Sequence, residues 1–252
     1  MPDNKKVNRA RRQVEHPGYE KNASETDHAI ASQIDPSKSL VVSGFWRSGT
    51  TWLQEYLAAT LQAKTIFEPF HFLVPGSKNL FRFYRILKKP QGFKELFLPY
   101  CAARSLQNYP LLMNDFDRAL RADLPGPAVR VLRKSVEESR LTRVVVKFTR
   151  GQLCLRAAQE AFEMPLIHIY RDPRAVVASM KMTDWFWLFD HLGLQEQLLK
   201  VKDGRATVFS VWADAIAEYD GDKIARIAAY WALSEKYLED SFSDRPDKIA
   251  VV

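Results

Sequence analysis

The segment from Leu40 to Leu61 constrains the fold more than any other part of the chain. It begins with the run Leu40-Val-Val-Ser43, which is apolar and β-branched, as a buried strand of a parallel sheet should be. Gly44 ends this run, and a helical pattern with leucines on one face extends from Thr50 to Leu61. A strand, a glycine-containing loop and a helix in this order present backbone amides and the positive end of a helix to a phosphate. The segment therefore predicts an α/β protein with a phosphate-binding loop.

Within this loop, Gly44 and Gly49 have the spacing of the nucleotide-binding P-loop, but the lysine that follows in that motif is missing. Thr50 and Thr51 stand there instead, and the loop carries its cation as Arg47. Without the lysine, the usual contact to the β- and γ-phosphates of a triphosphate is absent, which argues against triphosphate hydrolysis. A donor with one phosphate and one transferable group fits better. The alternative is that the two glycines only turn the chain.

The rest of the chain alternates predicted strands and helices. Strands are predicted at residues 143–147 and 166–170, and residues 249–252 resemble the beginning of another strand. Helices are predicted at residues 152–162, 174–182 and 225–238. This alternation predicts the α/β class, with one domain at residues 38–252 and a central parallel sheet flanked by helices. Several prolines break residues 67–132 into short helices and loops, of the kind that cover such a sheet.

The first 37 residues are polar and poor in aromatic side chains, so we expect a disordered arm there. They lack the apolar stretch of a secretory signal, and no part of the chain has the roughly 18 consecutive apolar residues that a membrane span needs. The two cysteines, Cys101 and Cys154, are read as buried structural thiols. Together these features predict a cytoplasmic protein.

The net charge of +7 suits either a polyanionic ligand or simple solubility. Nucleic-acid binding is not expected, because no basic helix with interleaved aromatic residues and no nucleic-acid motif accompanies the charge. No metal is expected either, since the sequence has no HExxH motif or Cys/His cluster. The oligomeric state cannot be predicted.

The loop sequence Trp46–Trp52, W-R-S-G-T-T-W, resembles the 5′-phosphosulfate loop of sulfotransferases that use 3′-phosphoadenosine-5′-phosphosulfate (PAPS). The resemblance implies a P-loop-like, sulfotransferase-type nucleotide fold. It also implies that the loop amides and the two threonine hydroxyls hold the 5′-phosphate, while Arg47 faces the bridging oxygen and the sulfuryl group. The donor-binding residues implied here are Arg47, Ser48, Gly49, Thr50, Thr51 and Trp52.

A second motif, Tyr170-Arg-Asp-Pro-Arg-Ala-Val-Val-Ala-Ser179, resembles the 3′-phosphate motif of the same family. By that resemblance, Arg171 and Ser179 hold the 3′-phosphate of PAPS; an arginine fork with a hydroxyl suits this group. Asp172 is predicted to cap the helix that follows. Arg174 is interpreted as a surface charge or a brace for the turn, rather than as a ligand contact.

Sulfuryl transfer to a hydroxyl needs a base for the acceptor's proton and cations for the departing phosphate. Thr149 stands where the small-molecule branch of the family has its histidine base, whereas Phe67-Glu-Pro-Phe-His71 resembles a segment of the carbohydrate-directed branch. By analogy, Glu68 is the candidate base, and His71 is its rival. Glu68 is expected in extended backbone before a proline. The alternative for Glu68 is a structural ion pair with Arg47, Lys147 or another cation.

Three further assignments concern side chains around these motifs. Lys147 lies at a strand's carboxyl end and is interpreted as a second catalytic cation, with a structural ion pair as the alternative. His168 is expected to be a core histidine. The aromatic run Trp185–Phe189 is expected to pack against the lid, the short helices and loops predicted at residues 67–132, or else to line an acceptor pocket.

The resemblance thus implies direct in-line transfer of a sulfuryl group from PAPS to a hydroxyl, with 3′,5′-adenosine bisphosphate as the second product. The resemblance to the carbohydrate-directed branch suggests a sugar hydroxyl as the acceptor, and a lipid, a polyketide or another small alcohol is the alternative. A kinase or NTPase with an altered loop and a catalytically silent PAPS-binding protein are the alternatives. Family members continue past the final strand, so residues 38–252 are expected to be truncated at the C-terminal end or to leave the donor site open.

Overall fold

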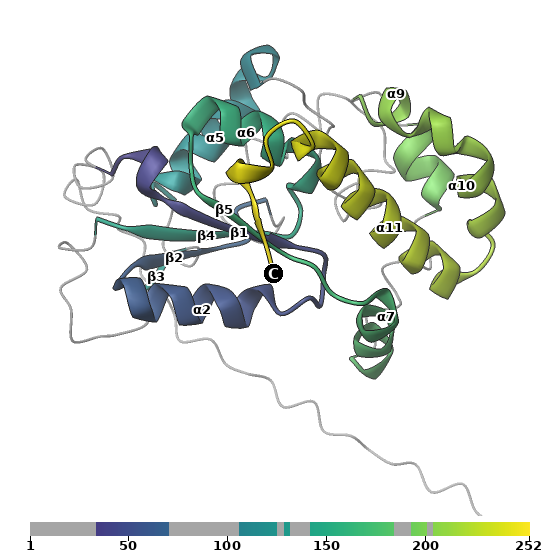
Figure 1. Cartoon of the computed structure of the whole chain (residues 1–252), viewed down its shortest axis with the longest axis horizontal. Helices are drawn as coiled ribbons and strands as arrows, with labels where there is room; N and C mark the ends of the chain where they lie inside the picture. The colour runs from purple at the N-terminus through teal and green to yellow at the C-terminus, as the bar shows by residue number, and fades with distance from the viewer. Residues whose placement is uncertain (1–33, 71–105, 125–128, 132–141, 184–192, 201–203) are drawn as a thin grey trace, which may run out of the picture.

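The computed structural model describes residues 34–70, 106–124, 129–131, 142–183, 193–200 and 204–252. Its centre is a six-stranded sheet of strand order β3-β2-β4-β1-β5-β6 (Figure 1). Strands β2, β4, β1, β5 and β6 are parallel, and β3 is antiparallel to β2. The strands are β1 (Leu40–Gly44), β2 (Lys64–Phe67), β3 (Val129–Val131), β4 (Val144–Phe148), β5 (Leu166–Ile169) and β6 (Ala250–Val251). The predicted parallel sheet is confirmed.

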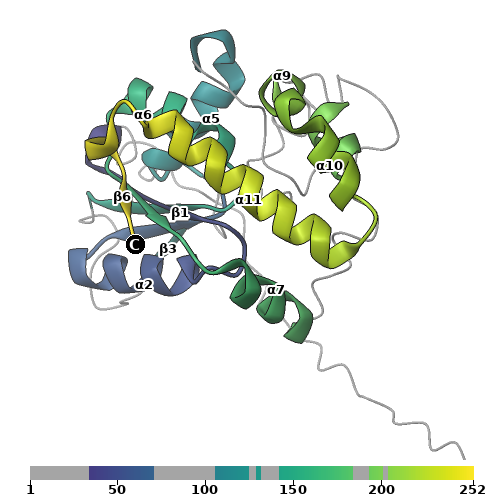
Figure 2. The same ribbon diagram turned by 45° about the vertical axis from the view of Figure 1, so that its right-hand side comes forward.

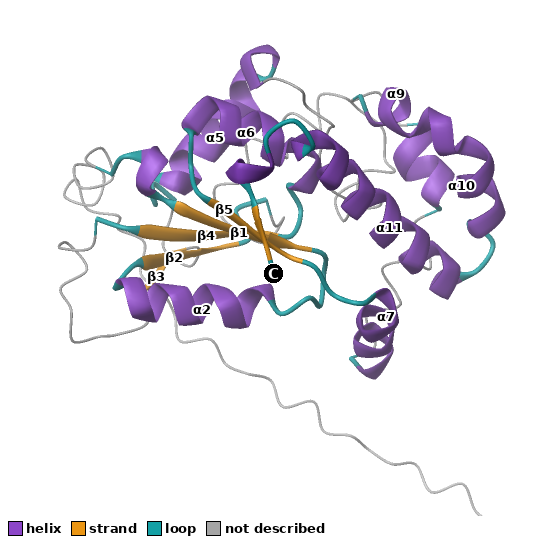
Figure 3. Ribbon diagram, viewed as in Figure 1, coloured by secondary structure: helices purple, strands orange, loops and turns teal. Residues whose placement is uncertain are grey.

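Helices cover both faces of this sheet (Figures 1 and 3). One face carries α2, and the opposite face carries α5, α6 and α11, as Figure 2 shows from a second direction. The helices are α2 (Thr50–Leu61), α5 (Pro110–Leu120), α6 (Leu155–Phe162), α7 (Pro173–Met182), α9 (Arg205–Phe209), α10 (Ala213–Tyr219) and α11 (Lys223–Phe242). Neighbouring residues of β1 point to opposite faces of the sheet. Val41 packs in the cluster with α5 and α6, while Val42 packs with Ala58 of α2.

Helix α2 has the predicted bounds, but its most buried face differs from the leucine face. Thr50, Gln54 and Ala58 are buried, and the leucines of the helix are only partly buried beside them. The reason is the amide of Gln54, which donates to the carbonyl of Ile66 at 2.8 Å and to that of Val145 at 2.9 Å. These two hydrogen bonds draw the middle of the helix onto β2 and β4.

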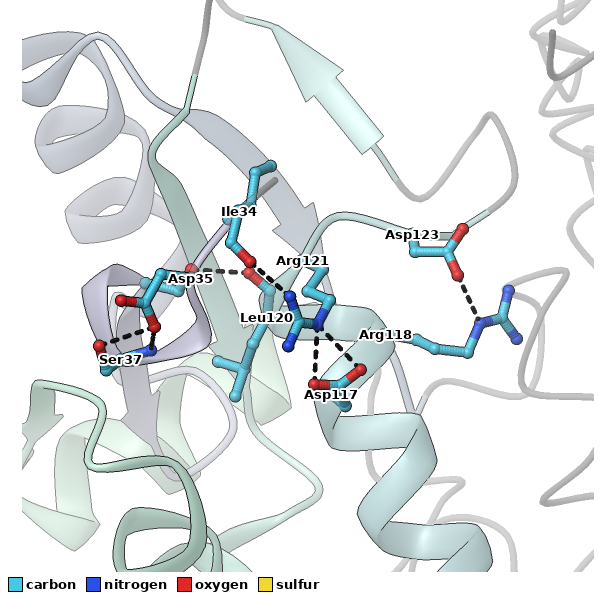
Figure 4. A network of polar contacts seen from close by, with 9 residues as sticks. Ile34, Asp35, Ser37, Asp117, Arg118, Leu120, Arg121 and Asp123 are labelled. Carbon is cyan, nitrogen blue, oxygen red and sulfur yellow. Dashed lines mark hydrogen bonds and ion pairs between the residues drawn. The ribbon is translucent and has the colours of Figure 1, made fainter. Parts of the chain in front are cut away.

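Ordered structure begins before the predicted domain boundary. Ile34 is buried in the core, and a 3₁₀ turn spans Pro36–Lys38. Arg121, which follows α5, donates to the carbonyl of Ile34 at 2.8 Å and also pairs with Asp117 (Figure 4). This network fastens the start of the described chain to α5.

Some predictions can be checked, and others lie outside the described residues. Cys154 is a buried thiol, as expected. Cys101, His71 and Trp185–Phe189 lie outside the described residues, as do residues 1–33 of the predicted arm. In the part of the chain that the structure describes, no helix is long and apolar enough to cross a membrane.

Candidate active site

The predicted phosphate loop joins β1 to α2 and contains two residues in the left-handed region, Arg47 at φ 66° and Gly49 at φ 93°. Gly49 directly precedes α2 and provides no side-chain cap. The first backbone amides of that helix therefore have no partner within the helix and can donate to a ligand. The hydroxyl of Ser48 is buried and has no hydrogen-bond partner among the described residues. The Ser48 amide donates to the Phe45 carbonyl at 3.1 Å, so Ser48 has its hydroxyl left for a ligand. A buried hydroxyl of this kind, next to the first amides of a helix, which have no intrahelical partner, suits a bound phosphate.

Glycine is required at position 44 because there is no room for a side chain, and not because of its backbone angles. A Cβ at this position would lie 2.8 Å from Cγ2 of Thr50 and 3.0 Å from the carbonyl oxygen of Ile169. The loop therefore leaves the sheet in contact with both α2 and β5.

We expect Gly44→Ala to lower the free energy of unfolding by about 1–3 kcal/mol, because the added methyl group overpacks this corner. In a domain of this size, that corresponds to about 3–10 °C in Tm. Gly221→Ala is the matched control, since a Cβ at that position meets no heavy atom within 4 Å. Thermal unfolding of both variants checks this expectation, and equal Tm values would contradict the close packing at Gly44.

The second predicted motif lies against the loop. Nε of Arg47 donates to Oγ of Ser179 at 3.0 Å, and Nη1 of Arg171 donates to the carbonyl oxygen of Arg47 at 2.5 Å. Because β5 pairs with β1, the start of α7 comes beside the loop although more than 120 residues separate them in sequence. The residues predicted for the two ends of the donor thus meet in one place.

At the start of α7, Asp172 is the helix cap that the sequence predicted. Its carboxylate accepts from the backbone amide of Arg174 at 2.7 Å. The side chain of Arg174 folds back onto Asp172 and is 90% exposed. These hydrogen bonds from Arg174 lower the pKa of Asp172 to about 2. Arg174 is therefore a surface charge that braces the turn.

Glu68 lies at the end of β2, buried beside the end of β4. Its carboxylate accepts from the Thr149 hydroxyl at 2.5 Å and from the Thr149 amide at 3.3 Å. Nζ of Lys147 and Nη1 of Arg150 each lie 3.4 Å from it. The ion pairs anticipated as the alternative role of Glu68 are thus present with Lys147 and Arg150.

The expectation of extended backbone at Glu68 is wrong, because its φ is 48°, in the left-handed region. A residue other than glycine in such a conformation costs about 1–3 kcal/mol unless its surroundings hold it. Here the contacts of the carboxylate with Thr149 and the two cations hold it. Strained backbone of this kind is concentrated at functional sites.

Lys147 connects Glu68 to the phosphate loop. Its Nζ donates to the hydroxyl of Thr51 at 2.9 Å and lies 3.6 Å above the centre of the Phe67 ring. Burial lowers the pKa of Lys147, and the nearby Glu68 carboxylate opposes this shift. A desolvated ammonium shared between the loop and a carboxylate is well placed to meet negative charge in the loop.

Trp52 and Thr51 extend from the exposed side of the loop and helix. The Trp52 side chain is 70% exposed and stacks on Tyr56, with ring centres 5.7 Å apart and ring planes at 12°. Thr50, by contrast, is buried against Gly44. The loop thus presents two neighbouring threonines in different surroundings.

A sequence model described as the sulfotransferase family matches residues 39–228, which is most of the chain and includes both motifs. The chain belongs to the sulfotransferase family. Family membership supports sulfotransfer as the general activity of this transferase. A search of curated proteins finds no match.

Among the described residues of this sulfotransferase, four cations lie in or beside the loop at Trp46–Thr51. They are Arg47, Lys147, Arg150 and Arg171, and the carboxylate that contacts two of them is Glu68. Arg150 also lies over the Trp46 ring, at 5.6 Å from its centre. This positive surplus suits a ligand with several anionic groups.

The sequence did not identify Thr149 or Arg150 as contacts of Glu68. The spacing of Lys147 and Arg150 was a signal, because it places two cations just at and beyond the end of one strand. His168 was assigned correctly as a core histidine: it is 2% exposed, and its Nε2 lies 2.7 Å from Oε2 of Glu235.

Proposed function

We propose that this sulfotransferase transfers a sulfuryl group from PAPS to a hydroxyl acceptor. The observation that carries the proposal is the contact between Arg47 of the phosphate loop and Ser179 of the second motif. Because the two motifs lie side by side, one ligand with anionic groups at two positions could contact both of them, as PAPS would with its 5′-phosphosulfate and 3′-phosphate. The unpartnered buried hydroxyl of Ser48 and the four cations fit such a ligand.

The assignment of residues follows from these positions. The loop residues Ser48, Gly49, Thr50 and Thr51 would hold the 5′-phosphate, with Trp52 beside them at the start of α2. Arg171 and Ser179 would hold the 3′-phosphate. When bound, PAPS supplies the sulfuryl group that is transferred.

The chain's own side chains would do the remaining work. Glu68 would accept the proton of the acceptor hydroxyl, and Lys147 and Arg47 would stabilise the negative charge that develops on the leaving phosphate. Lys147 is already in contact with Thr51 of the loop, so its charge can act there without a large movement. The transfer would be direct, with a sulfate ester and 3′,5′-adenosine bisphosphate as products.

The acceptor class is proposed from the segment around Glu68. Phe67-Glu-Pro resembles the carbohydrate-directed branch of the family, and the structure joins this Glu to Lys147 and Arg150. A sugar hydroxyl is therefore the first acceptor to test, with small alcohols next.

Transfer of labelled sulfate from PAPS to a panel of sugars and small alcohols tests the activity. Labelled product supports the proposal. Mg-ATP hydrolysis without PAPS binding would replace it with phosphotransfer. Tight binding of 3′,5′-adenosine bisphosphate without transfer to any acceptor would indicate a silent binding protein.

Arg171→Met tests the donor assignment separately from turnover. We expect its affinity for 3′,5′-adenosine bisphosphate to fall by about 10- to 100-fold, since a charge-assisted contact to the 3′-phosphate is lost. Adenosine 5′-monophosphate lacks that phosphate, so its affinity should fall much less. Calorimetric titration of both nucleotides gives the ratio.

Arg174→Met is the matched control, because this arginine is exposed and paired with Asp172. It should bind both nucleotides as the wild type does. Equal losses for the two nucleotides in Arg171→Met would show that Arg171 only supports the loop carbonyl of Arg47, and would remove it from the 3′-phosphate site.

A further inference from the structure

Thr149, which follows β4, holds the Glu68 carboxylate by both of its oxygens. Its hydroxyl donates to Oε1 at 2.5 Å, and its backbone amide lies 3.3 Å from Oε2. Both residues are buried, with exposed fractions of 6% for Thr149 and 4% for Glu68. One residue therefore fixes the rotation of the carboxylate as well as its position.

The cations around Glu68 are held less closely. Lys147 and Arg150 lie 3.4 Å from the carboxylate oxygens, whereas charge-assisted hydrogen bonds usually measure about 2.7–2.9 Å. Lys147 also makes a closer contact of 2.9 Å with Thr51. The hydroxyl of Thr149 is thus the tightest of the described contacts to this carboxylate.

The sheet explains why Thr149 is the residue that does this. Phe67 of β2 is in register with Lys147 of β4, so the residues just beyond these two strand ends lie side by side. Glu68 reaches Thr149 only because its backbone turns into the left-handed region. A carboxylate has about four lone-pair positions, and the two contacts to Oε2, from the Thr149 amide and Arg150, are both long.

We propose that Thr149 is a positioning residue for sulfuryl transfer, whose hydroxyl clamps Oε1 of Glu68 and leaves Oε2 to accept the proton of the acceptor. This inference rests on the proposed function of Glu68. In this chain, the residue at the end of β4 orients the base, and the base itself comes from the end of β2.

Thr149→Val removes the hydroxyl and nearly keeps the shape of the side chain. We expect kcat to fall about 10-fold, with KM for PAPS and the affinity for 3′,5′-adenosine bisphosphate within about 2-fold of the wild type. Thr149→Ser keeps the hydroxyl and should restore most of kcat. Thr60→Val is the matched control, because Thr60 is exposed and its hydroxyl donates to the Tyr56 carbonyl of its own helix, and its kcat should not change.

The pH profile separates positioning from general support of the fold. Because the Thr149 hydroxyl contacts the proposed proton acceptor, the pH profile of kcat should change in Thr149→Val, whereas loss of a residue that only supports the fold should leave the shape of that profile unchanged. Of the described residues, the charged groups against this carboxylate are Lys147 and Arg150, and Glu55 of α2 acts on Lys147. None of the three is changed by the substitution.

The outcomes distinguish the inference from its premise. Wild-type protein that transfers no sulfate would overturn the proposed function and this inference with it. An active wild type, with kcat and pH profile unchanged in Thr149→Val, would overturn the role of Thr149 alone. Circular dichroism reports whether Thr149→Val folds; if it does not, Thr149→Ala takes its place with the same expected results.

Discussion

Glu68→Gln is expected to lower kcat by about 10²- to 10⁴-fold, the contribution that a general base makes to proton transfer. Glutamine keeps the size of the side chain and can still accept from the Thr149 hydroxyl, so the left-handed turn at residue 68 should persist. The affinity for 3′,5′-adenosine bisphosphate should stay within a few-fold of the wild type. Steady-state kinetics with PAPS and an accepted hydroxyl, together with nucleotide titration, provide the measurement.

The pH profile of Glu68→Gln distinguishes a catalytic base from a residue that only braces the site through its ion pairs. Removal of a base should abolish the acidic limb of kcat, whereas loss of a brace should lower the plateau and keep the limb. Glu196→Gln is the matched control, because Glu196 is exposed and pairs with its neighbour Lys200 on the surface. Near-normal kcat with intact nucleotide binding would show that Glu68 is not the base and that its role is structural, through its ion pairs.

Lys147→Met is expected to lower kcat by about 10²- to 10³-fold, comparable to the loss of one preorganised donor to developing negative charge. The methionine fills the same buried space beside Phe67, so the sheet should keep its packing. Lys236→Met, on the exposed side of α11, is the control and should match the wild type. A loss confined to KM for PAPS would assign Lys147 to donor binding alone.

The pKa of Lys147 couples this prediction to the previous one. Burial lowers it and Glu68 raises it, so Glu68→Gln should lower it further. The ammonium is then lost at a lower pH, and the residual activity of Glu68→Gln should decline earlier as the pH rises. Rate measurements above neutrality check the sign, and an alkaline limb at the wild-type position would contradict it.

The elements that the sequence predicted well are those with long apolar patterns. β1, β4 and β5 are rich in branched apolar residues, and α2, α7 and α11 have helical periodicity. β2 is not predicted because Lys64 and Thr65 leave it without an apolar run, and β3 has three residues in a proline-rich region. Segments with so little apolar pattern take their conformation from the strands beside them.

The contacts within the site could not be predicted, because they depend on the order of the strands. β2 follows β1 in sequence but pairs with β4, and this places Glu68 beside Thr149, with Lys147 between Glu68 and the phosphate loop. The sequence suggests Arg47 as an ion-pair partner for Glu68, yet the Arg47 side chain turns toward Ser179 because β5 is on the other side of β1. Local sequence names the residues, and the pairing of distant strands decides which of them meet.

The double hydrogen bond of Gln54 has a consequence for the alignment of the reacting groups. It fastens the helix behind the phosphate loop to Ile66, two residues before Glu68, and to Val145, two residues before Lys147. Gln54 contacts the backbone of both β2 and β4. This one side chain therefore sets the distance from the start of α2 to Glu68 and Lys147, the two groups proposed to act on the acceptor and the leaving oxygen. Small errors in such spacing are costly to a reaction that needs three groups in line. Gln54, one turn into α2, thus helps to fix the relative positions of the phosphate loop, Glu68 and Lys147.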